Sequence, residues 1–268
     1  MNIMNAKILT SLLITALLIV SCNGKIINTD IIRNLHNENT ESDIVQVNYN
    51  QKVHGYHVTV VWKPILIKSG NAVGPAMLEF KNDSTVFTLT NNHFSLPATL
   101  VDVETDENNI IGVKTNQIAI DYKKPTIQNK LFEMIAVPFL FVDLDFDGEK
   151  EILLTKSGQG QRFGDAYDVY ALDAGILSPD FYQITNKEPY NQIDHKTKLN
   201  KEKKELTIYS AGGACGSTEQ TYSLVNGALT VMKRIRMEPA GNSSKCFELT
   251  YSVENGLETL LSKRDIPM

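Results

Sequence analysis

Five acidic residues are crowded into the segment FVDLDFDGEKEILL, residues 141–154. Like charges at this spacing repel one another, so the folded chain must leave them in solvent or place a cation among them. Side-chain oxygens at alternate positions converge when a chain curls around one centre, and the glycine after the third aspartate allows the sharp turn that this requires. The candidate ligands are Asp143, Asp145, Asp147 and Glu151, together with the backbone carbonyl of Glu149.

Hard oxygen ligands in this number favour Ca²⁺ over Mg²⁺ or a soft metal ion. The twelfth position counted from Asp143 is Leu154, where a helix–loop–helix calcium site has glutamate. Apolar runs on both sides of the acidic loop predict strands rather than helices. We therefore expect Ca²⁺ in a loop between two β-strands, with Glu151 closing the site from the ninth position. The alternative is a solvated acidic turn that holds no metal.

The elements that must position this loop have the two-residue period of β-strands. From residue 51 onward, alternating segments rich in β-branched and aromatic residues are separated by prolines and turn residues. AMLEF and TVFTLT flank Asn82 and Asp83 and predict a hairpin, whereas residues 125–134 are the best candidate for a helical turn. Further strands are expected at HVTVVW, ATLVDVE, GVKTNQIAIDY, VPFLFVDLDF, EILLTK, AYDVYAL and ELTIYS.

A short internal repeat marks the C-terminal part of the chain. TYSLVNGALTVMKR begins at Thr221 and TYSVENGLETLLSKR begins at Thr250, and each contains an Asn-Gly step between alternating residues. Asn-Gly supplies the two positive-φ residues of a type I′ hairpin turn. The sequence therefore predicts a mainly β fold, an antiparallel meander of hairpins that forms a twisted sandwich or a partial β-propeller with at most short helices.

The N-terminal residues have the pattern of an export signal. An apolar run at 8–20 follows Lys7 and is too short to span a bilayer comfortably. It ends in IVSC, which resembles the lipobox of bacterial lipoproteins, and the resemblance implies cleavage before Cys22 and lipid attachment to its thiol. We expect a signal peptide at 1–21 and a polar tether at 22–48, followed by continuous β regions at 49–135 and 136–268.

Two cysteines remain, Cys215 and Cys246. An even pair in an exported chain predicts a disulfide. The alternatives are two buried free thiols or, less favoured because no paired ligand spacing accompanies them, a zinc site.

The composition argues against two classes of function. The formal net charge is −5, which is unfavourable for a nucleic-acid partner. No nucleophile, zinc-protease or phosphate-loop motif occurs, so we do not expect an enzyme.

Two loops rich in small residues are the candidate contact sites, SGQGQRFGDAY after residue 156 and SAGGACGSTEQTY from residue 210. Exposed loops on a rigid β scaffold often carry binding residues, although both loops could also be plain connections. The residues expected to contact a partner are Ser157, Gln161, Arg162, Phe163 and Tyr167.

The order of these features resembles periplasmic calcium-binding lipoproteins related to bacterial lysozyme inhibitors and to immunity proteins against peptidoglycan hydrolases. The acidic loop itself resembles those of FG-GAP and VCBS repeats, in which D-x-D-x-D-G-x-x-[DE] ends at the ninth position. The resemblance covers residues 138–231 and implies a lipid-anchored protein of the bacterial envelope, facing the periplasm, which binds a cell-wall hydrolase and can inhibit it. The alternative is a non-inhibitory FG-GAP-type binding module in which calcium is purely structural.

Overall fold

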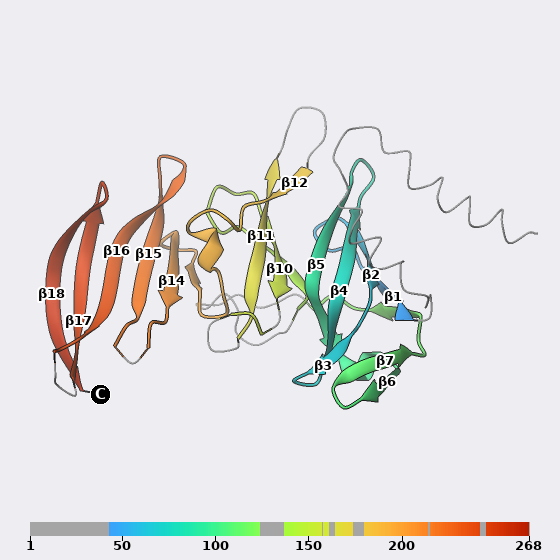
Figure 1. Cartoon of the computed structure of the whole chain (residues 1–268). Coiled ribbons are helices and arrows are strands. Elements are labelled where there is room, and N and C mark those ends of the chain that lie inside the picture. The colour runs from blue at the N-terminus through green and yellow to red at the C-terminus, as the bar shows by residue number, and fades with distance from the viewer. Residues whose placement is uncertain are drawn as a thin grey trace, which may run out of the picture. The chain divides into compact units, whose positions relative to one another are not determined.

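The computed structural model describes residues 43–123, 137–156, 158–160, 164–173, 180–213, 215–241 and 245–267. Their regular structure is β-strand with short 3-10 turns such as η2 (Ala98–Leu100) and η4 (Tyr190–Gln192), which confirms the mainly β prediction (Figure 1). No helix among these residues is long and apolar enough to cross a membrane. Ser42–Met268 forms one compact unit, and the helical turn expected at 125–134 lies outside the described residues.

The first of three sheets has eight strands, in the order β6-β7-β3-β4-β2-β1-β8, with β5 paired to β4. Most of its pairs are antiparallel, but β1 and β8 run parallel. The hairpin predicted around Asn82 is the β4–β5 pair, and the Asn82 side chain accepts the backbone N–H groups of Ser84 and Thr85. The strands are β1 (Val45–Tyr49), β2 (His57–Trp62), β3 (Leu66–Lys68), β4 (Asn71–Lys81), β5 (Val86–Pro97), β6 (Val103–Asp106), β7 (Asn109–Val113) and β8 (Gln117–Ile120).

The other two sheets are antiparallel meanders. The second has the order β12-β11-β10-β9, and the third runs in chain order from β13 to β18. The second sheet contains β9 (Phe139–Val142), β10 (Glu151–Lys156), β11 (Ala166–Asp173) and β12 (Asp180–Gln183). The third contains β13 (Lys198–Asn200), β14 (Glu205–Ser210), β15 (Thr218–Val225), β16 (Ala228–Pro239), β17 (Lys245–Glu254) and β18 (Leu257–Pro267).

The second sheet is buried on both faces. Phe139 and Phe141 of β9 pack into a core shared with the first sheet, whereas Leu140 and Val142 pack into a core shared with the third. Strand side chains alternate between faces, so a strand covered on both sides must be apolar at every position. This requirement explains the uninterrupted run FLFV before the acidic loop.

Both Asn-Gly steps form the turns that the sequence predicts. Asn226 and Gly227 join β15 to β16 with φ of 53° and 79°, and Asn255 and Gly256 join β17 to β18 with φ of 51° and 79°. Positive φ at both central residues is the requirement of a type I′ turn. The repeat therefore corresponds to two successive hairpins of the third sheet.

Two expected boundaries differ from the structure. β1 begins at Val45, inside the segment 22–48 predicted as a tether, because Val45 and Val47 are buried in the first core. The strand predicted at residues 98–104 begins instead with η2, whose turn is closed by the Val101 N–H donating to the Ala98 carbonyl, and β6 starts only at Val103.

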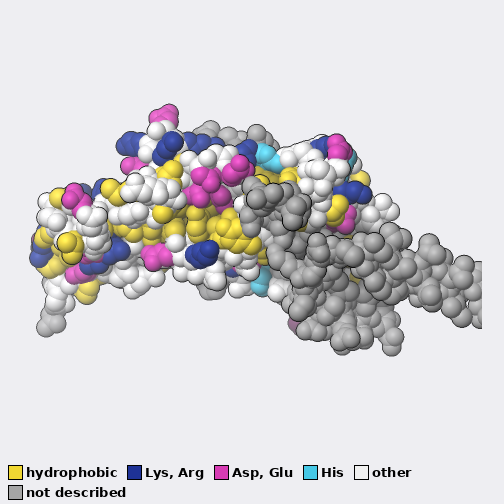
Figure 2. Space-filling view, turned by 90° about the horizontal axis from the view of Figure 1, so that it is seen from above, with side chains coloured by type: hydrophobic (Ala, Val, Ile, Leu, Met, Phe, Trp, Pro, Cys, Tyr) yellow, Lys and Arg dark blue, Asp and Glu magenta, His cyan; other side chains and the backbone are white. Residues whose placement is uncertain are grey.

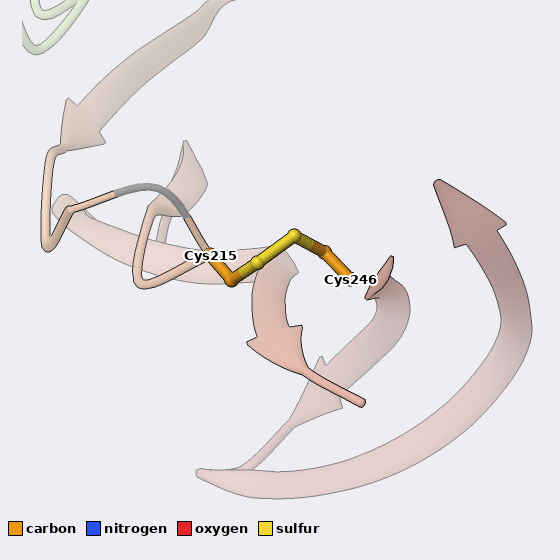
Figure 3. Close-up of a disulfide and its surroundings, with 2 residues drawn as sticks. All are labelled: Cys215 and Cys246. Atoms are coloured by element: carbon orange, nitrogen blue, oxygen red, sulfur yellow. A yellow bond between two sulfur atoms is a disulfide. The ribbon is translucent and has the colours of Figure 1, made fainter. Parts of the chain in front are cut away.

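The predicted disulfide joins Cys215, which precedes β15, to Cys246 on β17 (Figure 3). The Cα atoms lie 5.6 Å apart and both residues are buried. Because β16 lies between the two strands in the sheet, the bond links the loop before β15 across one intervening strand. The loop containing Cys215 is therefore covalently fixed to the third sheet.

We expect the double variant Cys215→Ser/Cys246→Ser to lose about 3 kcal/mol of unfolding free energy, because the bond closes a loop of 31 residues in the unfolded chain. Denaturant unfolding of the oxidised wild type and the variant measures the difference. A reducing agent should lower the stability of the wild type by a similar amount and leave the variant unchanged. Equal stability of all three forms would contradict the prediction.

Candidate metal centre

The acidic loop connects β9 to β10, which pair antiparallel with Val142 opposite Glu151. Leu144 and Phe146 are buried in the core shared with the third sheet. Because the side chains of Leu144 and Phe146 point into this core, the side chains of Asp143 and Asp145, which alternate with them, are held on the side of the loop that faces away from it. The sequence therefore fixes the acidic residues by anchoring the residues between them.

The turn itself is made of positive-φ residues and short hydrogen bonds. Phe146 has φ of 65° and Gly148 has φ of 96°, and the second value is one that L side chains rarely adopt. Asp147 Oδ1 accepts the Glu149 N–H at 2.7 Å, and Asp145 Oδ1 accepts the Asp147 N–H at 3.3 Å. These aspartate–backbone bonds hold the curl that the sequence predicts around Gly148.

Three carboxylates converge on one point. Asp143, Asp145 and Glu151 each offer an oxygen, and the three oxygens lie within 4.8 Å of one another. Glu151 is only 3 % exposed, and its Oε2 accepts the Leu144 N–H at 2.7 Å. Asp143 Oδ1 is buried and has no hydrogen-bond partner. An ionised oxygen that is both buried and unpartnered is costly unless a cation or proton faces it.

The electrostatics point in the same direction. Burial raises the pKa of Glu151 to about 8, and the charges of Asp145 and Asp147 add to this effect against the Leu144 N–H, which lowers it. Burial also raises the pKa of Asp145, with further contributions from the charges of Asp147 and Asp143. Protons are thus held where negative charges accumulate, and a divalent cation placed there would displace them.

Three of the predicted side-chain ligands are brought together, and Asp147 stands apart, while the prediction for Glu149 concerns its backbone carbonyl. The side chains of Asp147 and Glu149 are exposed and lie outside the three-carboxylate cluster of the described residues. In this geometry Asp147 shapes the turn. The carboxylates of Asp143, Asp145 and Glu151 fit a hard divalent cation such as Ca²⁺, which takes oxygen ligands and tolerates irregular geometry.

Tyr190 is a part of the site that the sequence does not reveal. It lies on η4, and its hydroxyl donates to Asp145 Oδ2 at 3.3 Å. The same segment reaches the third sheet, since Tyr222 of β15 donates its hydroxyl to Glu188 at 2.9 Å. No motif or spacing could indicate a contact between residues separated by 45 positions.

The predicted contact loop is described only in part. Ser157, Gln161, Arg162 and Phe163 lie outside the described residues, as does Cys22. Tyr167 is 6 % exposed and belongs to the core shared with the third sheet, so its burial does not fit the expected direct contact with a partner. Its neighbours on the same face, Val169 and Ala171, pack into this core as well.

The glycines of that loop allow close approaches between segments. The Gly160 N–H donates to the Gly164 carbonyl at 2.6 Å, and the Gly158 N–H donates to Asp165 Oδ1 at 3.0 Å. A Cβ at Gly164 would overlap the imidazole ring of His195, and a Cβ at Gly158 would overlap the Lys68 side chain. The described part of the loop therefore packs closely against the side chains of Lys68 and His195.

Comparison with known proteins shows a fold and no family. A search of protein families and of curated proteins finds no match. Among solved structures, the chain is similar to a Xanthomonas protein described as related to a type IV secretion system, with a TM-score of 0.50 and 13 % sequence identity. The similarity covers 84 % of this chain and 96 % of that chain, and at this identity it shows a shared fold alone.

Proposed function

We propose that this protein is a calcium-binding lipoprotein of the bacterial cell envelope that binds and inhibits a lysozyme-like cell-wall hydrolase. The observation that carries the proposal is the cluster of Asp143, Asp145 and Glu151, in which one carboxylate oxygen is buried without a partner. A cation there would have a structural role, because the cluster joins two strands of a sheet that is buried on both faces. The proposal places recognition in the neighbouring loop.

The position of that loop in the chain supports a link between metal binding and partner recognition. β10 begins at Glu151, a candidate ligand, and ends at Lys156, immediately before the loop expected to contact the partner. The Lys156 ammonium bonds Asp168 of β11 at 2.8 Å, so both strands that frame the loop are tied together. A cation that stabilises the start of β10 would thereby stabilise the base of the contact loop.

The proposed location rests on the disulfide and on the N-terminal pattern. A disulfide between buried cysteines is typical of proteins that fold outside the cytoplasm. The lipobox-like IVSC would provide attachment to a membrane through Cys22. The structural relative described as secretion-system related adds one practical suggestion, which is to include secreted bacterial hydrolases among the targets tested.

The test uses the chain without residues 1–22, which lie outside the compact unit Ser42–Met268. Purified protein is added to a panel of lysozymes and peptidoglycan hydrolases, and binding and turbidity clearing of cell walls are measured in Ca²⁺ and in chelator. We expect inhibition of at least one enzyme and weaker inhibition in chelator. Neither binding nor inhibition across the panel would overturn the proposal, and binding without inhibition would favour the non-inhibitory FG-GAP-type module.

A second test substitutes individual residues of the contact loop. We expect Arg162→Ala/Phe163→Ala to weaken inhibition about tenfold or more, because loss of an arginine and an aromatic anchor commonly has this effect at an interface. The matched control is Lys201→Ala/Glu202→Ala, in the exposed turn between β13 and β14. Equal losses in both variants, or none in the first, would remove the contact loop from the proposed interface.

A further inference from the structure

β18 is an edge strand whose outer side is unpaired among the described residues. It is the last strand of the third sheet, pairs with β17 on one side, and extends for 11 residues (Figure 1). The opposite edge of the sheet is β13, with only three residues. A long unpaired edge offers a row of backbone donors and acceptors to another strand, and proteins usually shorten, charge or cover such edges.

Exposed leucines accompany this open edge. Leu257, Leu260 and Leu261 are 75 %, 51 % and 62 % exposed. Around β17 and β18, the surface shows hydrophobic side chains interspersed with charged ones of both signs (Figure 2). Single exposed leucines are ordinary, but Leu260 and Leu261 are adjacent on one free strand edge, and a strand paired there would cover them.

The register of β18 sets which side chains share a face. Across β17, Thr250 faces Ser262 and Tyr251 faces Leu260, which leaves Leu261 as the extra residue of a β-bulge. Glu258 faces Val253 and Lys263 faces Leu249, two β17 residues on the same face. The bulge therefore brings Glu258 and Lys263 to one face of β18, although they are an odd number of positions apart.

We propose that β18 pairs antiparallel with β18 of a second copy of this chain, about a two-fold axis between Leu260 and Leu261. In this register Leu260 faces the second copy's Leu261, Thr259 faces its Ser262, and Glu258 faces its Lys263. The two-fold axis repeats each pair, so the apolar residues lie at the centre and opposite charges flank them on both sides. Opposite charges and apolar side chains placed across from each other stabilise an antiparallel pair.

The charges that surround this edge suit the same arrangement. Glu258 accepts hydrogen bonds from Arg234 and Arg236 of β16, on the inner side of β18, and the Lys263 ammonium lies over the Phe247 ring, so the Glu258–Lys263 pair forms when both side chains turn toward the new edge. If β18 paired with a further strand in another register, the charged Lys263 side chain would oppose that association, as lysines on edge strands do. Two-fold pairing uses the β18 edge of both copies and leaves no further long edge in the third sheet, so assembly stops at a dimer.

The experiment is sedimentation equilibrium of the chain without residues 1–22, in which the proposal predicts a concentration-dependent monomer–dimer equilibrium. The variants Leu260→Glu and Leu261→Glu place like charges across the axis, and each should weaken dimerisation about tenfold or more. The matched control is Leu257→Glu. It removes the most exposed of these leucines but faces Arg264 of the second copy in the proposed register, so the dimer should persist.

Each outcome bears on the proposal. Because all three leucines are exposed, the variants should keep the unfolding midpoint of the wild type, which separates loss of pairing from loss of folding. A wild-type chain that stays monomeric up to about 100 μM would overturn the proposal, because a dimer with a larger dissociation constant than this is not a stable assembly. Equal dissociation of all three variants would overturn the register, and capture of a different protein's extended segment by β18 would overturn the choice of a second copy.

Discussion

Calcium is expected to raise the unfolding midpoint of the wild-type chain, and the variant Glu151→Gln is expected to lose this response. A ligand present at 100 times its dissociation constant stabilises the folded state by about 2.7 kcal/mol. In a chain of this size, that corresponds to a rise of roughly 5–10 °C. Replacement of Glu151 removes one of the three converging carboxylates while keeping the shape of the side chain.

The same variant should change the pH dependence of stability in the absence of calcium. The pKa of Glu151 is raised to about 8 in the folded chain, from the ordinary glutamate value of 4.5. The folded state therefore holds the proton more tightly than the unfolded state, and the resulting stability is fully present below about pH 4.5 and is lost as the pH rises through about 8. The loss is on the order of 5 kcal/mol in the wild type and should be absent in Glu151→Gln.

Thermal unfolding of both chains at pH 5, 7 and 9, with calcium and with chelator, measures both effects. Glu149→Gln is the matched control, because the same chemical change is made to an exposed side chain that lies outside the cluster. The control should keep the calcium response of the wild type. A wild-type midpoint that does not respond to calcium, or a Glu151→Gln chain that still responds, would remove the metal centre.

Local patterns predicted the parts of this site that are close in the chain. The spacing of Asp143, Asp145 and Glu151 and the turn at Gly148 follow from one short segment, because alternation and glycine act within a few residues. The same is true of the Asn-Gly hairpins. Tyr190 could not be predicted, since its contact with Asp145 depends on how η4 packs against the loop.

The sequence could not show that the second sheet is buried on both faces. The alternation in β11 correctly places Tyr167, Val169 and Ala171 on one face. It does not say that the third sheet covers this face, so a residue expected at a partner surface is part of a core. Faces are local properties of a strand, whereas the layer that covers a face is decided by long-range packing.

Truncation of β9 tests whether both faces of the second sheet are covered. Phe139 is fully buried in the core shared with the first sheet, and its ring lies 5.3 Å from those of Tyr49 and Phe80, measured between centroids. Leu140, the next residue, is 1 % exposed in the other core. We expect Phe139→Ala and Leu140→Ala each to lower the unfolding free energy by about 3 kcal/mol or more, because each leaves a cavity in a packed core.

Urea unfolding at fixed calcium concentration measures these losses, and Leu257→Ala serves as the control because that side chain is 75 % exposed. The control should lose less than about 0.5 kcal/mol, as surface substitutions usually do. A large loss for Phe139→Ala with a small one for Leu140→Ala would mean that the third sheet does not cover β9 in solution. Large losses in both variants mean that the strand leading into the acidic loop is held from two sides, which is how a chain can keep converging carboxylates in place.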